Sequence, residues 1–270
     1  MSVPYITTND GTQYYEEKGR DRPLVMIHGW SFSGRFFHRN VDAFAEHARV
    51  ITIDLRGHGE SGKPDHGYRI PRLAADLRDV LVQLDLTDVT VPGWSLGCPV
   101  IWSYPELFGQ ERLRAAIFVQ QTPRQYYSPD WKPGHATCYD QAGLVFTQQR
   151  LTLNSDAFDE QNLSGCLRHP LPHDEKRFLL AEMKKCPSYV RSTLMADHTV
   201  HDWRDLLPHL NIPALVMVAK KDTVLNPGGP AWVAVHMPHA RAEVFEDSAH
   251  MIFIDETEKF NASVVSFLKQ

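Results

Sequence analysis

A serine flanked by two glycines carries the clearest chemical signal in this sequence. Residues 93–97 read Gly-Trp-Ser-Leu-Gly, and they follow an apolar β-rich run and precede a helix-forming stretch. In a sharp turn from strand to helix, glycines prevent collisions with neighbouring elements, and the serine hydroxyl is lifted out of the sheet. The helix N-terminus behind it favours developing negative charge. Ser95 is therefore the candidate nucleophile, and the alternative is a polar turn with an incidental serine.

A base and a carboxylate that could activate this serine stand later in the chain. A serine hydroxyl is a weak nucleophile at neutral pH, so it needs a base that is oriented by an acid. Asp222 follows the apolar run 214–219, and His250 follows the run 242–245. Both positions are at the carboxyl ends of expected strands, where open α/β sheets carry their sites. A turn residue for Asp222 and a surface position for His250 are the alternatives.

The order and the neighbouring loops favour this choice of acid and base. Serine, acid and histidine occur in the chain order that suits such a strand-to-helix nucleophile. The other loop that could supply the acid follows the run 114–119, and it reads Gln120-Gln121-Thr122 with no carboxylate. We therefore expect Asp222 to orient His250.

Cleavage of an acyl bond also requires hydrogen-bond donors for the tetrahedral oxyanion. The backbone N–H of Leu96 directly follows the nucleophile. We expect the second donor to be the backbone N–H of Trp30, in the tripeptide His28-Gly29-Trp30 after an early strand. An ordinary turn at the end of a strand is the alternative explanation for that tripeptide.

Short apolar, β-rich runs alternate with stretches of helical periodicity along most of the chain. Apolar side chains recur at helical spacing between residues 70 and 86 and again between 260 and 268. Strands that are apolar throughout need cover on both faces, so this order predicts an α/β fold with a mostly parallel, twisted sheet and helices on both sides. The runs expected to form strands are 3–7, 12–17, 24–27, 49–54, 88–91, 114–119, 214–219 and 242–245.

Glycine and proline predict three local details. Asn9-Asp10-Gly11 separates the first two apolar runs and is typical of a hairpin turn. Pro92 cannot donate a hydrogen bond to a sheet, so we expect it to mark the end of its strand. Pro99 is close enough to the start of the following helix to be tolerated in its first turn.

The alternation of strands and helices stops between about residues 122 and 210. That segment has helical fragments at 175–185 and 187–196, no convincing strand, and proline-bearing loops at both ends. We therefore expect residues 1–121 and 211–270 to form one core, into which residues 122–210 are inserted as a mostly helical unit.

Composition excludes several classes of protein. The chain has 270 residues with 28 basic and 33 acidic side chains and a formal net charge of −5, and it has no concentrated basic stretch, so we expect no nucleic-acid partner. It has no apolar run of about 18 residues, which argues against a membrane span, and its first residues lack the pattern of a secretory signal. The cysteines form no C-x-x-C pair and predict reduced thiols in a cytoplasmic protein. They are Cys98, Cys138, Cys166 and Cys186.

Two spacings resemble metal-binding motifs without completing one. His198 and His201 are three residues apart, as are His135 and Cys138, but the first pair lacks a nearby third ligand of the right type. An exposed helix or loop explains these residues, and we expect neither a metal ion nor any other cofactor. Cys98, near the nucleophile, is expected in helix packing.

Taken together, the motifs resemble the α/β-hydrolase superfamily over almost the whole chain. The resemblance rests on residues 28–30, on 93–97, on Asp222 and His250, and on Asp-Leu-Arg-Gly-His-Gly-Glu-Ser-Gly-Lys-Pro at 54–64. It implies that the last of these segments holds a tight loop beside the site rather than taking part in catalysis.

Among subgroups, the chain is most similar to esterases, lactonases and cofactor-free haloperoxidases, or perhydrolases. That last group often has a pair of glycines just after the nucleophile turn, whereas this chain has Gly97-Cys98-Pro99. Epoxide hydrolases and haloalkane dehalogenases use an aspartate where Ser95 stands, so the resemblance disfavours both.

The resemblance also implies that residues 122–210 form a helical cap, or lid, over the site. Tyr126, Trp131 and Met195 of this segment would line an apolar pocket together with Phe32 and Trp30 below. Ordinary packing in a small helical unit is the alternative role for these aromatic residues. A pocket of this kind predicts a mostly hydrophobic acyl or alcohol portion in the substrate.

These features predict a serine hydrolase that cleaves an ester or lactone of a small, largely apolar molecule through an acyl-enzyme. The same three residues also support carbon–carbon bond hydrolysis, perhydrolysis or cofactor-free dioxygenation, because one fold hosts many reactions. A non-enzymatic small-molecule receptor of the same fold is a further alternative. A small-molecule substrate is the only partner that the sequence indicates, and no feature specifies the oligomeric state.

Overall fold

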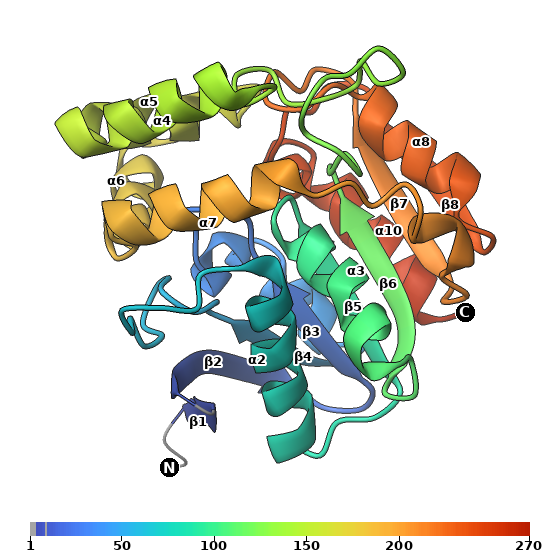
Figure 1. The fold of residues 1–270 in the computed structure, drawn as a ribbon. Coiled ribbons are helices and arrows are strands. Elements are labelled where there is room, and N and C mark those ends of the chain that lie inside the picture. Colours follow the sequence, from blue (N-terminus) through green and yellow to red (C-terminus); the bar gives the residue numbers. More distant parts are fainter. Residues whose placement is uncertain (1–3, 9) are drawn as a thin grey trace.

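Eight strands form one sheet in the order β1-β2-β4-β3-β5-β6-β7-β8 (Figure 1). The computed structural model of the chain describes residues 4–8 and 10–270, so Val3 of the first expected strand and Asn9 of the expected hairpin turn lie outside the described residues. The strands are β1 (Tyr5–Thr8), β2 (Gly11–Gly19), β3 (Pro23–Ile27), β4 (Arg49–Ile53), β5 (Val89–Trp94), β6 (Leu113–Val119), β7 (Ala214–Ala219) and β8 (Ala240–Phe245).

The sheet is mostly parallel. Among the strands of the described residues, β1 with β2 and β2 with β4 pair in antiparallel fashion. The strands β4, β3, β5, β6, β7 and β8 are joined by parallel pairings. The carboxyl ends of these parallel strands therefore meet at one edge. The predicted α/β fold class is confirmed.

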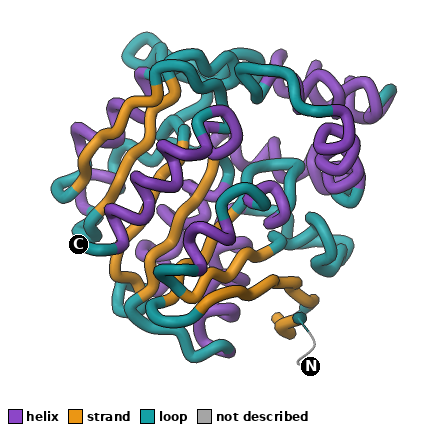
Figure 2. The backbone as a smooth tube through the Cα atoms, turned by 180° about the vertical axis from the view of Figure 1, so that it is seen from behind, coloured by secondary structure: helices purple, strands orange, loops and turns teal. Residues whose placement is uncertain are grey.

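Helices cover both faces of the sheet (Figures 1 and 2). Successive residues of a strand point to opposite faces, and in β3 the side chains of Val25 and Ile27 join one buried apolar cluster while those of Leu24 and Met26 join the other. The helices outside the 122–210 segment are η1 (Gly34–Phe37), α1 (Val41–Ala45), α2 (Ile70–Gln83), α3 (Gly97–Phe108), α8 (Gly228–His236), α9 (Ile252–Asp255) and α10 (Thr257–Leu268). The short 3-10 helix η2 (Leu207–His209) lies at the end of the 122–210 segment.

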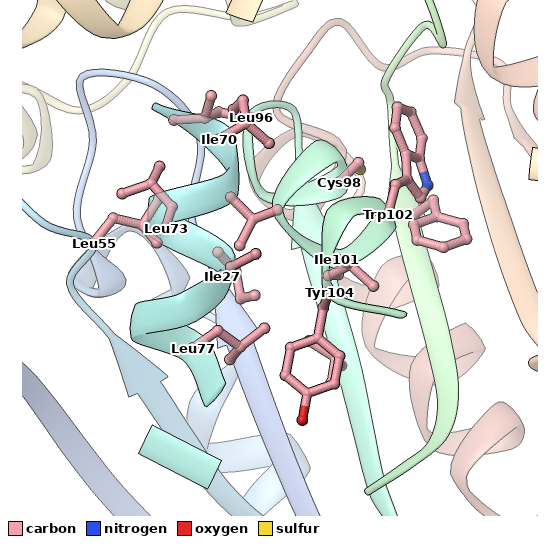
Figure 3. Packing of buried hydrophobic residues seen from close by; sticks show 14 of the residues in the cluster. Ile27, Leu55, Ile70, Leu73, Leu77, Leu96, Cys98, Ile101, Trp102 and Tyr104 are labelled. Atoms are coloured by element: carbon pink, nitrogen blue, oxygen red, sulfur yellow. The ribbon is translucent and has the colours of Figure 1, made fainter. Parts of the chain in front are cut away.

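The cluster under α2 and α3 anchors the nucleophile turn (Figure 3). Leu73 and Leu77 of α2 and Ile101 of α3 are fully buried beside Ile27 of the sheet. Because this side of α3 is held by core packing, the first turn of α3 has a fixed position over the end of β5.

Pro92 lies inside β5, which corrects the expectation that it ends the strand. Its Cα is in register with that of Ile117 in β6, and the strand continues to Trp94. A proline removes a single N–H from the ladder, and the pairings of the residues on either side hold the strand in the sheet. Pro99 lies in the first turn of α3, as expected.

Four α-helices lie between β6 and β7 in the chain, above the carboxyl ends of the parallel strands (Figure 1). They are α4 (Gln141–Leu153), α5 (Ser155–Gly165), α6 (His173–Lys184) and α7 (Ser188–Val200). Trp30 Nε1 donates a hydrogen bond of 2.9 Å to the carbonyl oxygen of Arg191. The N–H of Ile70 donates one of 2.8 Å to Asp197 Oδ2. These bonds fix α7 over the loop after β3 and the start of α2.

In the part of the chain that the structure describes, no helix is both long enough and apolar enough to span a membrane.

Candidate active site

The backbone at Ser95 is left-handed, with a φ of +51°. Ser95 lies between β5 and α3, in a turn that is closed by the two glycines of the motif. A Cβ atom added to Gly93 would lie 2.7 Å from the carbonyl carbon of Gly97, and one added to Gly97 would lie 2.5 Å from the carbonyl oxygen of Ile27. Only glycine fits at either position. The close packing of the turn therefore holds the serine in a conformation that costs free energy.

Asp222 and His250 meet at the carboxyl edge of the sheet. Asp222 follows β7 and His250 follows β8, and the distance from Asp222 Oδ2 to His250 Nδ1 is 2.8 Å. Both side chains are buried. The other carboxylate oxygen of Asp222 accepts a hydrogen bond of 2.7 Å from the N–H of Val224. With Nδ1–H donating to the carboxylate, the imidazole keeps Nε2 free to act as a base.

Ser95 and His250 line the same cavity, which has a volume of about 260 Å³. Within the described residues the hydroxyl and the imidazole do not form a hydrogen bond. Such bonds are often long in empty sites and shorten when a substrate binds. The geometry thus places an oriented imidazole and a strained serine on one cavity.

The loop after β3 packs directly against the nucleophile turn. A Cβ atom added to Gly29 would lie 3.3 Å from Ser95 Cβ. The imidazole of His28 holds this loop, because Nδ1–H donates to the carbonyl of Gly29 at 2.7 Å and Nε2 accepts from the N–H of Leu55 at 3.0 Å. Burial lowers the pKa of His28 to about 4, so this side chain is a neutral structural element.

The two expected oxyanion donors lie on either side of Ser95. Leu96 follows it in the chain, and Trp30 follows Gly29 in the packed loop. Neither backbone N–H has a hydrogen-bond acceptor among the described residues. Both are therefore available to a bound oxygen atom.

Gln120 is a functional residue that sequence reasoning did not identify. It follows β6 with a φ of +48°. Its Nε2 donates a hydrogen bond of 2.7 Å to the carboxylate of Asp222, and its Oε1 accepts one of 2.7 Å from the N–H of Ala219. Its position in the loop beside β7 was the sequence feature that could have identified it. A criterion that requires a carboxylate in that loop does not select an amide side chain.

The cavity contains some of the aromatic and apolar residues expected in it. Trp30, Phe32 and Met195 line it, whereas Tyr126 and Trp131 do not, so the prediction for these two is wrong. Trp131 instead packs edge-on against Trp232, with ring centroids 5.8 Å apart. The Tyr126 hydroxyl lies 3.5 Å from Thr199 Oγ1, in packing against α7.

Polar side chains from the helical segment make up another part of the cavity wall. The pocket expected from the sequence was mostly apolar and did not contain them. They come from the loop before α4 and from α4, α5 and α7. These residues are Gln125, His135, Thr137, Thr147, Arg150, Gln161, Asn162 and His198.

The residues of the 54–64 segment hold a loop. Asp54 Oδ1 accepts a hydrogen bond of 2.7 Å from the N–H of Gly34, and Oδ2 accepts one of 2.8 Å from the N–H of Glu60. Burial raises the pKa of Asp54 to about 6. His58 Nε2 accepts from the N–H of Ser31 at 3.3 Å. Neither Asp54 nor His58 lines the cavity.

Cys98 is buried with its Sγ atom 3.0 Å from the carbonyl oxygen of Gly93, and burial raises the pKa of its thiol. The described residues contain no group of three or more His, Cys, Asp or Glu side chains arranged to hold a metal ion.

The chain matches the family model of the alpha/beta hydrolase fold over residues 22–177, and it belongs to that family. It is an enzyme of the alpha/beta hydrolase type.

Particular relatives cover nearly all of the chain. It is 28% identical to the non-heme chloroperoxidase CPO-A1 of Kitasatospora aureofaciens, over 99% of this chain and 100% of that protein. It is 24% identical to a pimeloyl-[acyl-carrier protein] methyl ester esterase of Vibrio cholerae, over 94% of this chain and 97% of that protein. The solved structure of an esterase from Exiguobacterium antarcticum is similar with a TM-score of 0.94 and 25% identity, covering 100% of both chains.

Proposed function

We propose that this enzyme is a serine hydrolase that cleaves a carboxylic ester or a lactone through an acyl-enzyme. The observation that carries the proposal is the 2.8 Å contact between His250 Nδ1 and Asp222 Oδ2 at the cavity that Ser95 also lines. The esterases among the relatives support the choice of ester chemistry.

In the first half of the proposed reaction, His250 Nε2 takes the proton of the Ser95 hydroxyl as Oγ attacks the substrate carbonyl carbon. The N–H groups of Leu96 and Trp30 stabilise the resulting oxyanion. Collapse of this intermediate breaks the bond to the alcohol, which takes its proton from His250. Water then attacks the acyl-enzyme by the same route and releases the acid.

The cavity supports a small substrate. Its volume of about 260 Å³ is just below the usual range for small-molecule sites. Met195 and His198 of α7 form part of its wall together with Phe32 of the core. This shared wall supports a second part of the proposal, in which residues 122–210 act as a cap that selects the substrate.

The test is hydrolysis of 4-nitrophenyl butyrate by the wild-type protein and by Ser95→Ala. We expect the variant to lose at least about 10³-fold in kcat/KM, because only the oxyanion donors and substrate binding remain. Circular dichroism and the unfolding midpoint should match the wild type. Wild-type turnover by the alanine variant would overturn the proposal.

Perhydrolysis is a second candidate, which the similarity to a chloroperoxidase favours. Hydrogen peroxide would replace water as the nucleophile that attacks the acyl-enzyme, giving a peracid. Peracid formed from acetate and hydrogen peroxide, and lost in Ser95→Ala, would support this activity. Its absence alongside ester hydrolysis would exclude it.

A further inference from the structure

His135 presents a hydrogen-bond donor to the cavity. Its Nδ1 lies 3.0 Å from the backbone N–H of Thr137 and 3.0 Å from that of Cys138. Since both of these groups donate, Nδ1 is an acceptor, and the ring proton must be on Nε2. No described residue accepts a hydrogen bond from Nε2, although His135 lines the cavity with Ser95 and His250.

His198 has a fixed tautomer of the opposite kind. Gln121 Oε1 accepts a hydrogen bond of 2.7 Å from the N–H of Thr122, so the amide nitrogen of Gln121 is the atom that lies 3.3 Å from His198 Nε2. That nitrogen can only donate, so His198 Nε2 accepts and the proton is on Nδ1. His198 Nδ1 is buried without a partner in the described part of the chain, and the residue is only 5% exposed.

Both imidazoles are neutral. Burial, followed by the nearby His250, lowers the pKa of His135 to about 4. Burial, followed by His201 and then His135, lowers the pKa of His198 to about 3. His135, His198 and His250 all line the same cavity.

The cavity wall has more unpaired donors than unpaired acceptors. Asn162 Nδ2 is a third donor that has no partner among the described residues, and Gln125 Oε1 is a buried acceptor without one. A buried donor without an acceptor costs free energy. The guanidinium of Arg150 also lines the cavity, but it bonds to Gln161 Oε1 and lies over the Phe158 ring, with its carbon 5.3 Å from the ring centroid.

We propose that the substrate carries a second carbonyl oxygen besides the ester that is cleaved, and that His135 Nε2–H and His198 Nδ1–H bind this oxygen. A carbonyl oxygen has two lone pairs and can accept from both donors. Neutral N–H donors suit a neutral carbonyl oxygen, because they supply no charge to offset the burial of a carboxylate. The guanidinium of Arg150 is already engaged with Gln161 and the Phe158 ring. The inference rests on the proposed function, and it makes the substrate class an oxo ester or oxo lactone.

The experiment compares substrates of equal length. We would measure kcat/KM for the 4-nitrophenyl esters of hexanoic, 4-oxohexanoic and 5-oxohexanoic acid. The ratio of the better oxo ester to hexanoate is the readout. Comparing this ratio between variants removes the intrinsic reactivity of each ester from the comparison. A merely structural defect would lower kcat/KM for all three esters by the same factor.

We expect His135→Leu and His198→Leu each to lower this ratio about fivefold to tenfold, which is the effect of one neutral hydrogen bond. His198→Asn, whose amide N–H lies near the position of Nδ1–H, should retain most of the ratio. The matched control is His201→Phe, because His201 stacks on Trp203 outside the cavity, and its ratio should equal that of the wild type.

An unchanged ratio in both leucine variants, for both oxo esters, would overturn the inference. That result differs from failure of the proposed function, in which the wild-type protein would not hydrolyse hexanoate in a Ser95-dependent manner.

Discussion

Gln120 Nε2 and His250 Nδ1 contact the same oxygen of Asp222, at 2.7 Å and 2.8 Å. The amide of Gln120 is itself fixed, because its oxygen accepts from the N–H of Ala219 in β7. Gln120 therefore orients the carboxylate from the strand beside it, and we expect it to be a positioning residue for the proposed triad.

We expect Gln120→Leu to lower kcat about tenfold with little change in KM, since a hydrogen bond to a charged group contributes about 1.5–3 kcal/mol and its loss lets the carboxylate rotate. The N–H of Ala219 also loses its acceptor, so stability should fall. Steady-state kinetics at a temperature where both proteins are folded checks this. A kcat within twofold of wild type would show that Asp222 is oriented without Gln120.

The glycines of the nucleophile turn provide a prediction for stability. Gly97→Ala places a Cβ atom 2.5 Å from the carbonyl oxygen of Ile27, and backbone atoms of a packed sheet cannot move away cheaply. We expect a loss of about 1–3 kcal/mol in the free energy of unfolding, measured by urea titration. Gly165→Ala is the control, because its Cβ would meet no atom within 4 Å. Equal stability of the two variants would contradict the packing argument.

The sequence predicted the sheet because its signals are local, and the same signals placed the three candidate catalytic residues at the ends of strands. Apolar runs and their flanking turns identified β7 at the residues where it occurs, and Ser95, Asp222 and His250 each follow such a run. The expectation for Pro92 was wrong because pairing with neighbouring strands continues β5 beyond this residue. The local sequence pattern contains no information on that pairing.

The rest of the site depends on contacts between distant segments. Gln120 can contact Asp222 only because β6 and β7 lie side by side. Trp131 packs against Trp232 of α8 and does not line the cavity. His135 and His198 each belong to a spacing in the sequence that resembles a metal-binding motif. Their actual partners are backbone amides and a glutamine amide, which no spacing between histidines reveals.

A buried ion pair in the helical segment should control its stability. Arg191 of α7 bonds to Asp159 of α5, and both side chains are almost fully buried. Asp159→Ala leaves a buried guanidinium unpaired, so we expect a loss of about 3–5 kcal/mol. The double variant Asp159→Leu/Arg191→Met should recover much of this loss, as urea unfolding would show. A double variant no more stable than Asp159→Ala would contradict this account of the pair.

The neutral state of His198 predicts a pH dependence of stability. Its pKa is about 3 in the folded protein and near 6.5 when unfolded. Between these values the unfolded chain binds more protons, so the contribution of this residue to stability is present above pH 6.5 and is lost as the pH falls toward 3. His198→Asn removes the titrating group.

We therefore expect the wild type to lose roughly 1–2 kcal/mol more than His198→Asn when urea unfolding is compared at pH 7 and pH 5. An equal loss of unfolding free energy between pH 7 and pH 5 in the two proteins would mean that His198 is not held neutral in the folded state.

Activation of Ser95 by His250 is tested most directly by covalent labelling with a fluorophosphonate, followed by peptide mass spectrometry. We expect a single adduct on Ser95 in the wild-type protein and a labelling rate lower by at least about 10²-fold in His250→Ala, because the base that removes the hydroxyl proton is absent. An adduct on another residue, or an equal labelling rate in the two proteins, would contradict the account.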